Sequence, residues 1–142
     1  MKFRSLTSGS AVVISALALA LAGTSSAVAA APAISVSPST NLTDGTDITV
    51  SVSGFGAGEQ IYAAQCAQLS ESVAVCNLPD ALELVTDASG NASGATWARK
   101  TFEGTAPNGE VVSVDCSTAP NGCVFGAGSQ STPGASVPIT FQ

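Results

Sequence analysis

The sequence contains no histidine among its 142 residues, and this removes the commonest catalytic base. Without histidine, neither a Ser-His-Asp triad nor a Cys-His pair can be built. The acidic residues are scattered and no spacing marks a catalytic pair, although two carboxylates could still meet in the folded chain. No glycine-rich phosphate loop precedes a helical pattern. The sequence therefore predicts that the protein is not an enzyme.

Basic residues are also scarce. The chain has 4 Lys and Arg against 10 Asp and Glu, and its formal net charge is −6. A surface so poor in cations has little with which to neutralise phosphates, which argues against direct nucleic-acid binding. Because like charges repel, we expect a soluble monomer.

The N-terminus has the pattern of a secretory signal peptide. Lys2 and Arg4 precede an apolar run of roughly 12 residues, which is shorter than the roughly 20 residues of a membrane-spanning helix. Small residues follow, and we expect cleavage after Ala29 or Ala30, with Ala30 preferred. Loss of Lys2 and Arg4 would change the net charge from −6 to −8. We therefore expect a secreted, extracellular protein without a membrane anchor.

On this reading, residues 1–30 are the signal peptide and residues 31–142 form one small domain. Apolar and polar residues alternate there over short runs that end at turn-forming residues, as in half-buried strands. Pro138 indicates an edge strand near the C-terminus. We predict an all-β, antiparallel two-sheet sandwich of about seven strands, at residues 34–37, 47–53, 61–66, 82–86, 92–100, 111–116 and 137–141.

Four cysteines in a small exported domain indicate two disulfides. Three pairings are possible, and we favour Cys66–Cys76 with Cys116–Cys123 because each of these pairs closes a short, turn-rich loop. Each bridge would contribute about 2–3 kcal/mol, so its main effect is on local shape. Zinc binding is disfavoured, since histidine is lacking and neither pair has the spacing of zinc ligands.

Without the signal peptide, the chain has one lysine, no histidine, no methionine and no expected free thiol. A protein with so few nucleophiles suits the storage of a reactive electrophile or radical precursor. Composition alone favours the plainer alternative, in which a small secreted sandwich has drifted to this composition.

The segments around the cysteines make the sequence recognisable. It resembles the apoproteins of the neocarzinostatin family of enediyne chromoproteins over the whole of residues 31–142. The resemblance includes Asp-Ala-Ser-Gly at 87–90 and Arg-Lys-Thr-Phe-Glu-Gly at 99–104. The other similar segments are residues 31–38, 42–45, 65–67, 75–77, 113–123 and 138–141.

This resemblance implies a seven-stranded immunoglobulin-like sandwich with a small two-stranded ribbon, and a ligand cleft between the two. The cleft would hold a non-covalently bound enediyne chromophore, with no true cofactor and no metal. The protein would protect and carry this antitumour or antibacterial antibiotic, and DNA would be attacked only by the released chromophore. Apolar contacts would supply most of the binding.

The resemblance also assigns candidate ligand-binding residues by position, and it places both disulfides at the cleft rather than in the main core. Several of these positions carry small or non-aromatic side chains, so we expect a roomier pocket than in neocarzinostatin. Gly94, Thr96 and Ala98 are also small, and we expect the ligand or Trp97 to fill the space beside them. The candidate ligand-binding residues carried over by position are Gln68, Ala74, Ala81, Pro107, Val124, Gly126 and Gly128, and Trp97 is added to them because of its place beside these small residues.

Two other functions remain open at this point. The chain could be a secreted immunoglobulin-like module that binds another small molecule or a surface partner and carries no enediyne. A protease acting on basic proteins is the third hypothesis, and the lack of histidine and of a free thiol argues against it.

Overall fold

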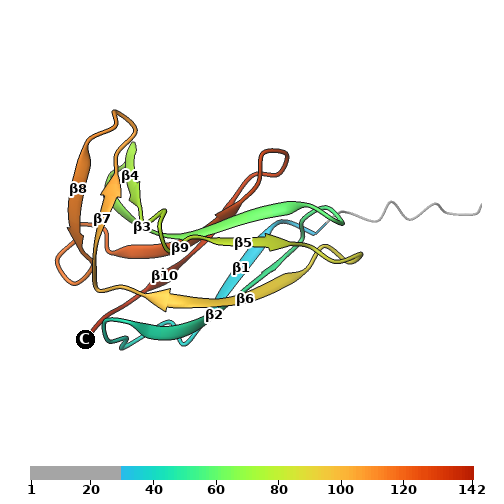
Figure 1. Ribbon diagram of the computed structural model, residues 1–142, viewed down its shortest axis with the longest axis horizontal. Helices are drawn as coiled ribbons and strands as arrows, with labels where there is room; N and C mark the ends of the chain where they lie inside the picture. The colour runs from blue at the N-terminus through green and yellow to red at the C-terminus, as the bar shows by residue number, and fades with distance from the viewer. Residues whose placement is uncertain (1–29) are drawn as a thin grey trace, which may run out of the picture.

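Ten strands run through residues 30–142, the part of the chain that the computed structural model describes (Figure 1). The predicted signal peptide lies outside the described residues, apart from Ala30. Within residues 30–142, no helix is long and apolar enough to span a bilayer. The strands are β1 (Ala33–Ser37), β2 (Thr46–Ser53), β3 (Gln60–Ser70), β4 (Val73–Cys76), β5 (Leu82–Val85), β6 (Ala92–Ala98), β7 (Thr101–Thr105), β8 (Val111–Asp115), β9 (Cys123–Gly128) and β10 (Ala135–Ile139).

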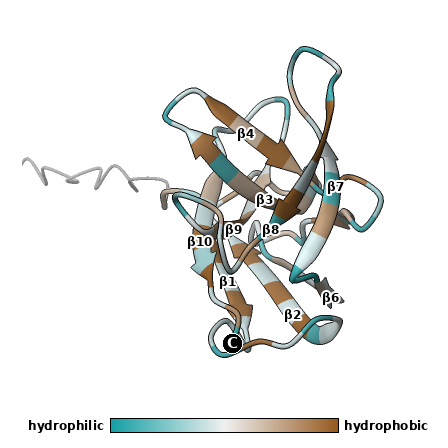
Figure 2. Ribbon diagram, turned by 90° about the vertical axis from the view of Figure 1, so that its left-hand side faces the viewer, coloured by the Kyte–Doolittle hydropathy of each residue, from teal (hydrophilic) through white to brown (hydrophobic). Residues whose placement is uncertain are grey.

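The smaller sheet has the antiparallel order β1-β2-β6. Strict alternation along β2 explains its orientation, because Ile48, Val50 and Val52 are buried while Asp47 and Thr49 are exposed. Figure 2 shows the same alternation as brown bands along β2. One face of this sheet is therefore committed to the core.

The larger sheet has the order β10-β9-β3-β4-β7-β8, and β5 pairs with the first half of β3. Strand β10 lies at its edge, where the missing N–H of Pro138 is tolerated, so the predicted edge strand is confirmed. Strands β10, β9, β3 and β5 face β1, β2 and β6. Together they make the seven-stranded antiparallel sandwich that the resemblance implied, although the strand predicted at 111–116 is β8 of a ribbon and β9 takes its place in the sandwich.

The remaining strands form two ribbons at one end of the sandwich. The second half of β3 turns back into β4, and β7 pairs with β8. These ribbons meet through a single pair, Cys76 with Thr105, and through the close approach of Gly104 to Val75. In Figure 1, β4, β7 and β8 rise together from the end of the long sheet.

One apolar core runs between the sheets and continues under the ribbons. Strand β1 contacts β10 and β5 contacts β6, so the sandwich is closed along both of its edges. Apart from Phe55, Phe102 and Phe125, the core is built mainly of Val, Leu, Ile and Ala. Such a core buries little area per residue, which makes the disulfides more important to stability.

The structure also corrects several predicted strands. The sequence predicted only a turn-rich loop between Cys66 and Cys76, but this segment is a β-hairpin in which Val75 is buried. Residues 101–105, where the sequence predicted no strand, form β7. The strand predicted at 92–100 ends at Ala98, because the chain there leaves one sheet for the other. Strands β4 and β7 are only four and five residues long, which is too short for local alternation to mark them.

Candidate functional site

The outer face of the larger sheet has small side chains where β3 and β9 lie side by side. Alternation turns Ala63, Gln65 and Ala67 into the core, and turns the intervening residues of β3 outward. In β9, Phe125 and Ala127 point inward in the same way. The resulting small-residue face consists of Ala64, Cys66, Val124, Gly126 and Gly128.

The strand register places these residues next to one another. Cys66 pairs with Val124, and Ala64 with Gly126. Gly128 pairs with Tyr62, whose half-exposed ring lies at the end of the face. A Cβ built on Gly126 would meet only the Ala135 carbonyl oxygen, at 3.9 Å. The face is therefore open at Gly126, where a flat apolar group could lie against the backbone of β9, whereas a Cβ on Gly128 would lie 3.3 Å from Gly134 Cα.

Two raised segments flank this face. The β3–β4 hairpin stands at one end, and the β9–β10 loop (residues 129–134) rises on the same side of the sheet at the other end (Figure 1). Gln68 and Ala74 are partners in the hairpin, two residues beyond Cys66 on the same face. The hairpin therefore adds a wall to the small-residue face.

The disulfide Cys66–Cys76 links β3 and β4 directly across their register, with a Cα–Cα distance of 4.0 Å. Both cysteines are half-buried and lie on the outward side of the hairpin. This bridge fixes the β3–β4 hairpin to the small-residue face, to which Cys66 belongs. The structure thus forms the first pairing that the sequence favoured.

The second predicted pairing, Cys116–Cys123, is also formed, but its position differs from the expectation. Cys123 is 2% exposed and Cys116 is 9% exposed, and both belong to the core. Since Cys123 alternates with Val124 along β9, the bridge lies on the opposite side of the sheet from the small-residue face. Only Cys66–Cys76 lies on that face.

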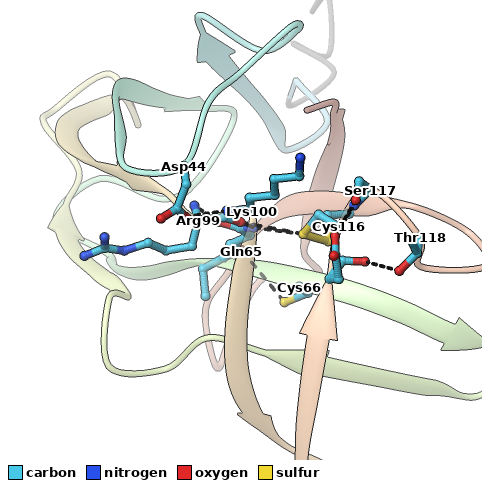
Figure 3. Close-up of a disulfide and its surroundings, with 11 residues drawn as sticks. Asp44, Gln65, Cys66, Arg99, Lys100, Cys116, Ser117 and Thr118 are labelled. Carbon is cyan, nitrogen blue, oxygen red and sulfur yellow. Dashed lines mark hydrogen bonds between the residues drawn. A yellow bond between two sulfur atoms is a disulfide. The ribbon is translucent and has the colours of Figure 1, made fainter. Parts of the chain in front are cut away.

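A buried glutamine connects the sandwich to the ribbons (Figure 3). The side chain of Gln65 donates to the Arg99 carbonyl oxygen at 2.5 Å and accepts from the Arg99 N–H at 2.8 Å. Its Nε2 also lies 3.1 Å from the Cys116 sulfur. The amide therefore pairs with Arg99 much as a neighbouring strand would.

Arg99 and Lys100 form the crossover from β6 to β7, and neighbouring groups hold both residues. The Lys100 N–H donates to Asp44 Oδ1 at 2.8 Å, and its ammonium donates to the Gln142 carbonyl at 2.7 Å. The Lys100 carbonyl accepts from the Cys116 N–H at 2.8 Å. The base of the β7–β8 ribbon is therefore fixed from several sides.

Two of the predicted site residues, Ala81 and Trp97, line a different hollow of about 310 Å³ at the β5–β6 edge of the sandwich. Trp97 is half-exposed on the outer side of the smaller sheet, opposite Asp47. The Arg99 guanidinium lies 5.5 Å from the centre of its ring and forms an ion pair with Asp80 at 3.2 Å. This hollow is separate from the small-residue face.

The position of Trp97 corrects the expectation about the space beside Gly94. Trp97 points away from the sandwich interior, whereas Gly94 lies on the inner side of β6. A Cβ at Gly94 would approach Leu84 Cδ2 to 2.8 Å and Leu82 Cδ1 to 3.7 Å. The two leucines of β5 occupy this space, and neither Trp97 nor a ligand is required to fill it.

Pro107 lies in a third place, between the tips of the two ribbons. It lines an apolar hollow of about 400 Å³ together with Leu69, Val73 and Val112. Of the eight predicted residues, the structure therefore brings Gln68, Ala74, Val124, Gly126 and Gly128 to one face. Ala81, Trp97 and Pro107 lie elsewhere on the surface.

Sequence reasoning missed Glu59, Tyr62 and Ala64. Tyr62 and Ala64 could have been found by extending the alternation of β3 outward from the core positions. Glu59 gave no local signal, because the hydroxyl groups that it binds lie about seventy residues away. It accepts hydrogen bonds from Ser129, Ser131, Thr132 and the Gly56 N–H, and these lower the pKa of its carboxyl to about 2.

A second carboxylate, Asp115, lies at the start of the second cysteine loop. The hydroxyl and the N–H of Ser117 donate to it, and these bonds lower the pKa of Asp115. Within the described part of the chain, no free cysteine occurs and no cluster of three or more candidate ligands could hold a metal ion.

Known proteins share both the sequence and the fold. A family model described as the neocarzinostatin family matches residues 34–141. The antitumor antibiotic C-1027 apoprotein of Streptomyces globisporus is 45% identical over 105 residues, which are 73% of this chain and 71% of that protein. Actinoxanthin from the same species is 44% identical over the same shares of each chain. Apokedarcidin from an Actinomycete species is 37% identical over 73% of this chain and 92% of that protein.

Solved structures agree with this match. Macromomycin superposes with a TM-score of 0.71 at 30% identity, over 79% of this chain and 100% of that chain. Apokedarcidin superposes with a TM-score of 0.65 at 36% identity, over 80% of this chain and 100% of that chain. With the family model covering nearly the whole sandwich, the chain belongs to the neocarzinostatin family.

Proposed function

We propose that this chain is a secreted apoprotein that non-covalently binds, protects and carries a labile enediyne-type chromophore. The small-residue face carries the proposal, because a sheet surface with glycines and alanines in register leaves room for a flat ligand against the backbone. Membership of a family whose similar members include an antibiotic apoprotein supports it.

The chemistry of the face suits an apolar, polycyclic ligand. Ala64, Val124 and the glycines offer no charge, and the core packed behind the sheet keeps the floor rigid. Apolar contacts against a preformed surface supply most of the affinity in such sites, while a few polar groups set orientation. Gln68 is the polar side chain of this face that could serve that purpose.

The charge of the protein determines whether we expect the protein or the chromophore to act on DNA. Arg99 and Lys100 are the basic residues of the described part of the chain, and both are engaged with acidic or carbonyl partners. We therefore assign any action on DNA to the released chromophore and none to the protein surface. The protein acts as a monomeric carrier without catalysis of its own, and its partner is the small molecule.

Native mass spectrometry of the protein secreted by its own host in the dark, with an absorbance spectrum, tests this function. We expect an additional non-covalent mass with near-ultraviolet absorbance that organic extraction removes. A bare polypeptide mass would contradict the carrier function and favour a module for another ligand or a surface partner.

A pair of variants then tests the location. Gly126→Phe places a large ring on the small-residue face, where the built Cβ meets little. Thr49→Phe places the same ring on the exposed outer face of the smaller sheet. We expect Gly126→Phe to retain the non-covalent ligand at least about tenfold less well than the wild type, and Thr49→Phe to retain it as the wild type does. Equal retention by both variants would place the ligand elsewhere, with the β5–β6 hollow as the next candidate.

A further inference from the structure

The β9–β10 loop is attached to the rest of the molecule through one carboxylate. Ser129 and Ser131 donate their hydroxyl protons to Glu59 Oε1, the second at 2.8 Å. Thr132 donates to Oε2 at 3.1 Å. Three of the four polar residues at positions 129–132 thus converge on a single side chain from the β2–β3 turn (residues 54–59).

The anchor itself is rigid. Glu59 Oε2 also accepts from the Gly56 N–H at 2.6 Å, which folds the carboxylate back over its own turn. The Glu59 N–H donates to the buried hydroxyl of Thr86 at 2.8 Å, and the Thr86 N–H donates to the Glu59 carbonyl at 3.0 Å. The carboxylate is therefore held in place before it meets the loop.

The loop depends on this anchor for its own internal order. The N–H groups of Ser131 and Thr132 donate to Ser129 Oγ at 3.2 and 2.9 Å, and that hydroxyl is the one bonded to Glu59. At the base of the loop, a Cβ on Gly134 would lie 2.8 Å from the Ala127 carbonyl oxygen. The chain is tightly packed at its base and fixed at its tip by Glu59.

The anchored loop borders the candidate ligand face. A hollow of about 210 Å³ is lined by Glu59, Tyr62 and Ser129 to Ser131, among others. Tyr62 is also the β3 residue that pairs with Gly128 at the end of the small-residue face. A loop that swings away from Glu59 would open this end of the face.

We propose that Glu59 is a positioning residue that holds the β9–β10 loop upright as a wall of the ligand face and thereby slows escape of the bound ligand. This inference rests on the proposed function for its second half only. The first half concerns the chain without any ligand and can be tested separately.

The variant Glu59→Gln keeps the size of the side chain and removes the charge that strengthens its hydrogen bonds. Glu103→Gln is the matched control, since Glu103 is exposed on β7 at the other end of the molecule. Ser131→Ala is a milder second variant that removes one donor from an exposed loop residue. It preserves the test if Glu59→Gln fails to fold.

Amide hydrogen exchange of the ligand-free chain gives the first readout. We expect exchange at Ser131 and Thr132 to accelerate at least about tenfold in Glu59→Gln and less in Ser131→Ala, because hydrogen bonds to a charged group are the strong ones. Glu103→Gln should match the wild type. Unchanged loop exchange in both test variants would overturn the proposal.

Dissociation of the uncharged planar fluorescent probe pyrene gives the second readout. We expect it to leave Glu59→Gln at least about fivefold faster than the wild type and Glu103→Gln. Faster loop exchange with unchanged probe dissociation would overturn the inference that the loop slows ligand escape, and would leave the proposed function intact. Failure of the wild-type chain to bind the probe at all would count against the proposed face and the gating together, while the exchange data would still decide whether Glu59 holds the loop.

Discussion

Replacement of Gln65 by leucine tests how the ribbons are held on the sandwich. Gln65 is 2% exposed and supplies partners for both the N–H and the carbonyl of Arg99. Leucine has nearly the same volume but cannot form either bond. The change therefore leaves two backbone groups without their partners at the point where β6 crosses to β7.

The magnitude follows from the cost of unpaired polar groups. Each backbone group left without a partner costs about 1–3 kcal/mol, and the added apolar burial of leucine offsets part of this. We expect Gln65→Leu to lower the free energy of unfolding by about 2–5 kcal/mol. This is a large share of the roughly 5–15 kcal/mol typical of a small domain.

Urea unfolding, followed by the fluorescence of the single tryptophan and by far-ultraviolet circular dichroism, measures this change. Gln60→Leu is the matched control, because Gln60 is exposed at the start of the same strand. The control should unfold within about 0.5 kcal/mol of the wild type. A loss below about 1 kcal/mol in Gln65→Leu would refute the reasoning and show that the crossover is held by the hydrogen bonds of Lys100 to Asp44, Gln142 and Cys116 instead.

Three further predictions concern the ribbons, the carboxylates and the disulfides. Gly104→Ala should lower the free energy of unfolding by about 1–3 kcal/mol, because its Cβ would collide with Val75 and the Cys76 carbonyl. Thermal unfolding measures this loss. Gly109→Ala, at a solvent-open turn with positive φ, shows the cost of backbone strain alone. The pKa of Glu59 is lowered to about 2 from the usual 4.5, so its contribution to stability is fully present above pH 4.5 and is lost as the pH falls towards 2. The urea midpoint of Glu59→Gln should therefore vary less with pH over this window than that of the wild type. The same pH dependence in both proteins would contradict the assignment. Mild reduction should open Cys66–Cys76 before Cys116–Cys123, because the first pair is half-buried and the second lies in the core; alkylation and peptide mapping decide the order, and simultaneous loss of both would indicate that global unfolding precedes reduction.

The all-β class and much of the strand pattern could be predicted because they are local properties. Alternation along β2 requires only that one side of the strand faces a core. The disulfide pairing was accessible for a similar reason, since a short chain between two cysteines restricts where they can lie. The edge position of β10 followed from the missing N–H of Pro138.

The candidate site could be predicted only in part. Resemblance pointed to seven positions, to which Trp97 was added, and the five in β3, β4 and β9 share one face because the register of these strands brings them together. Ala81 and Trp97 lie at the β5–β6 edge instead. Leu82 and Leu84 pack against Gly94, which turns the Gly94 side of β6 inward and leaves Trp97 on the outer side. No local pattern distinguishes these two outcomes.

The sequence by itself therefore determined the class of fold, the two covalent bridges and the family of this protein, since each depends on residues close in the chain or on similarity along it. Only the tertiary structure decided which side of the sheet each disulfide occupies, which small residues form a common face, and that Glu59 meets a loop about seventy residues away. Those features arise from contacts between distant segments, whose geometry is set by the whole packed sandwich.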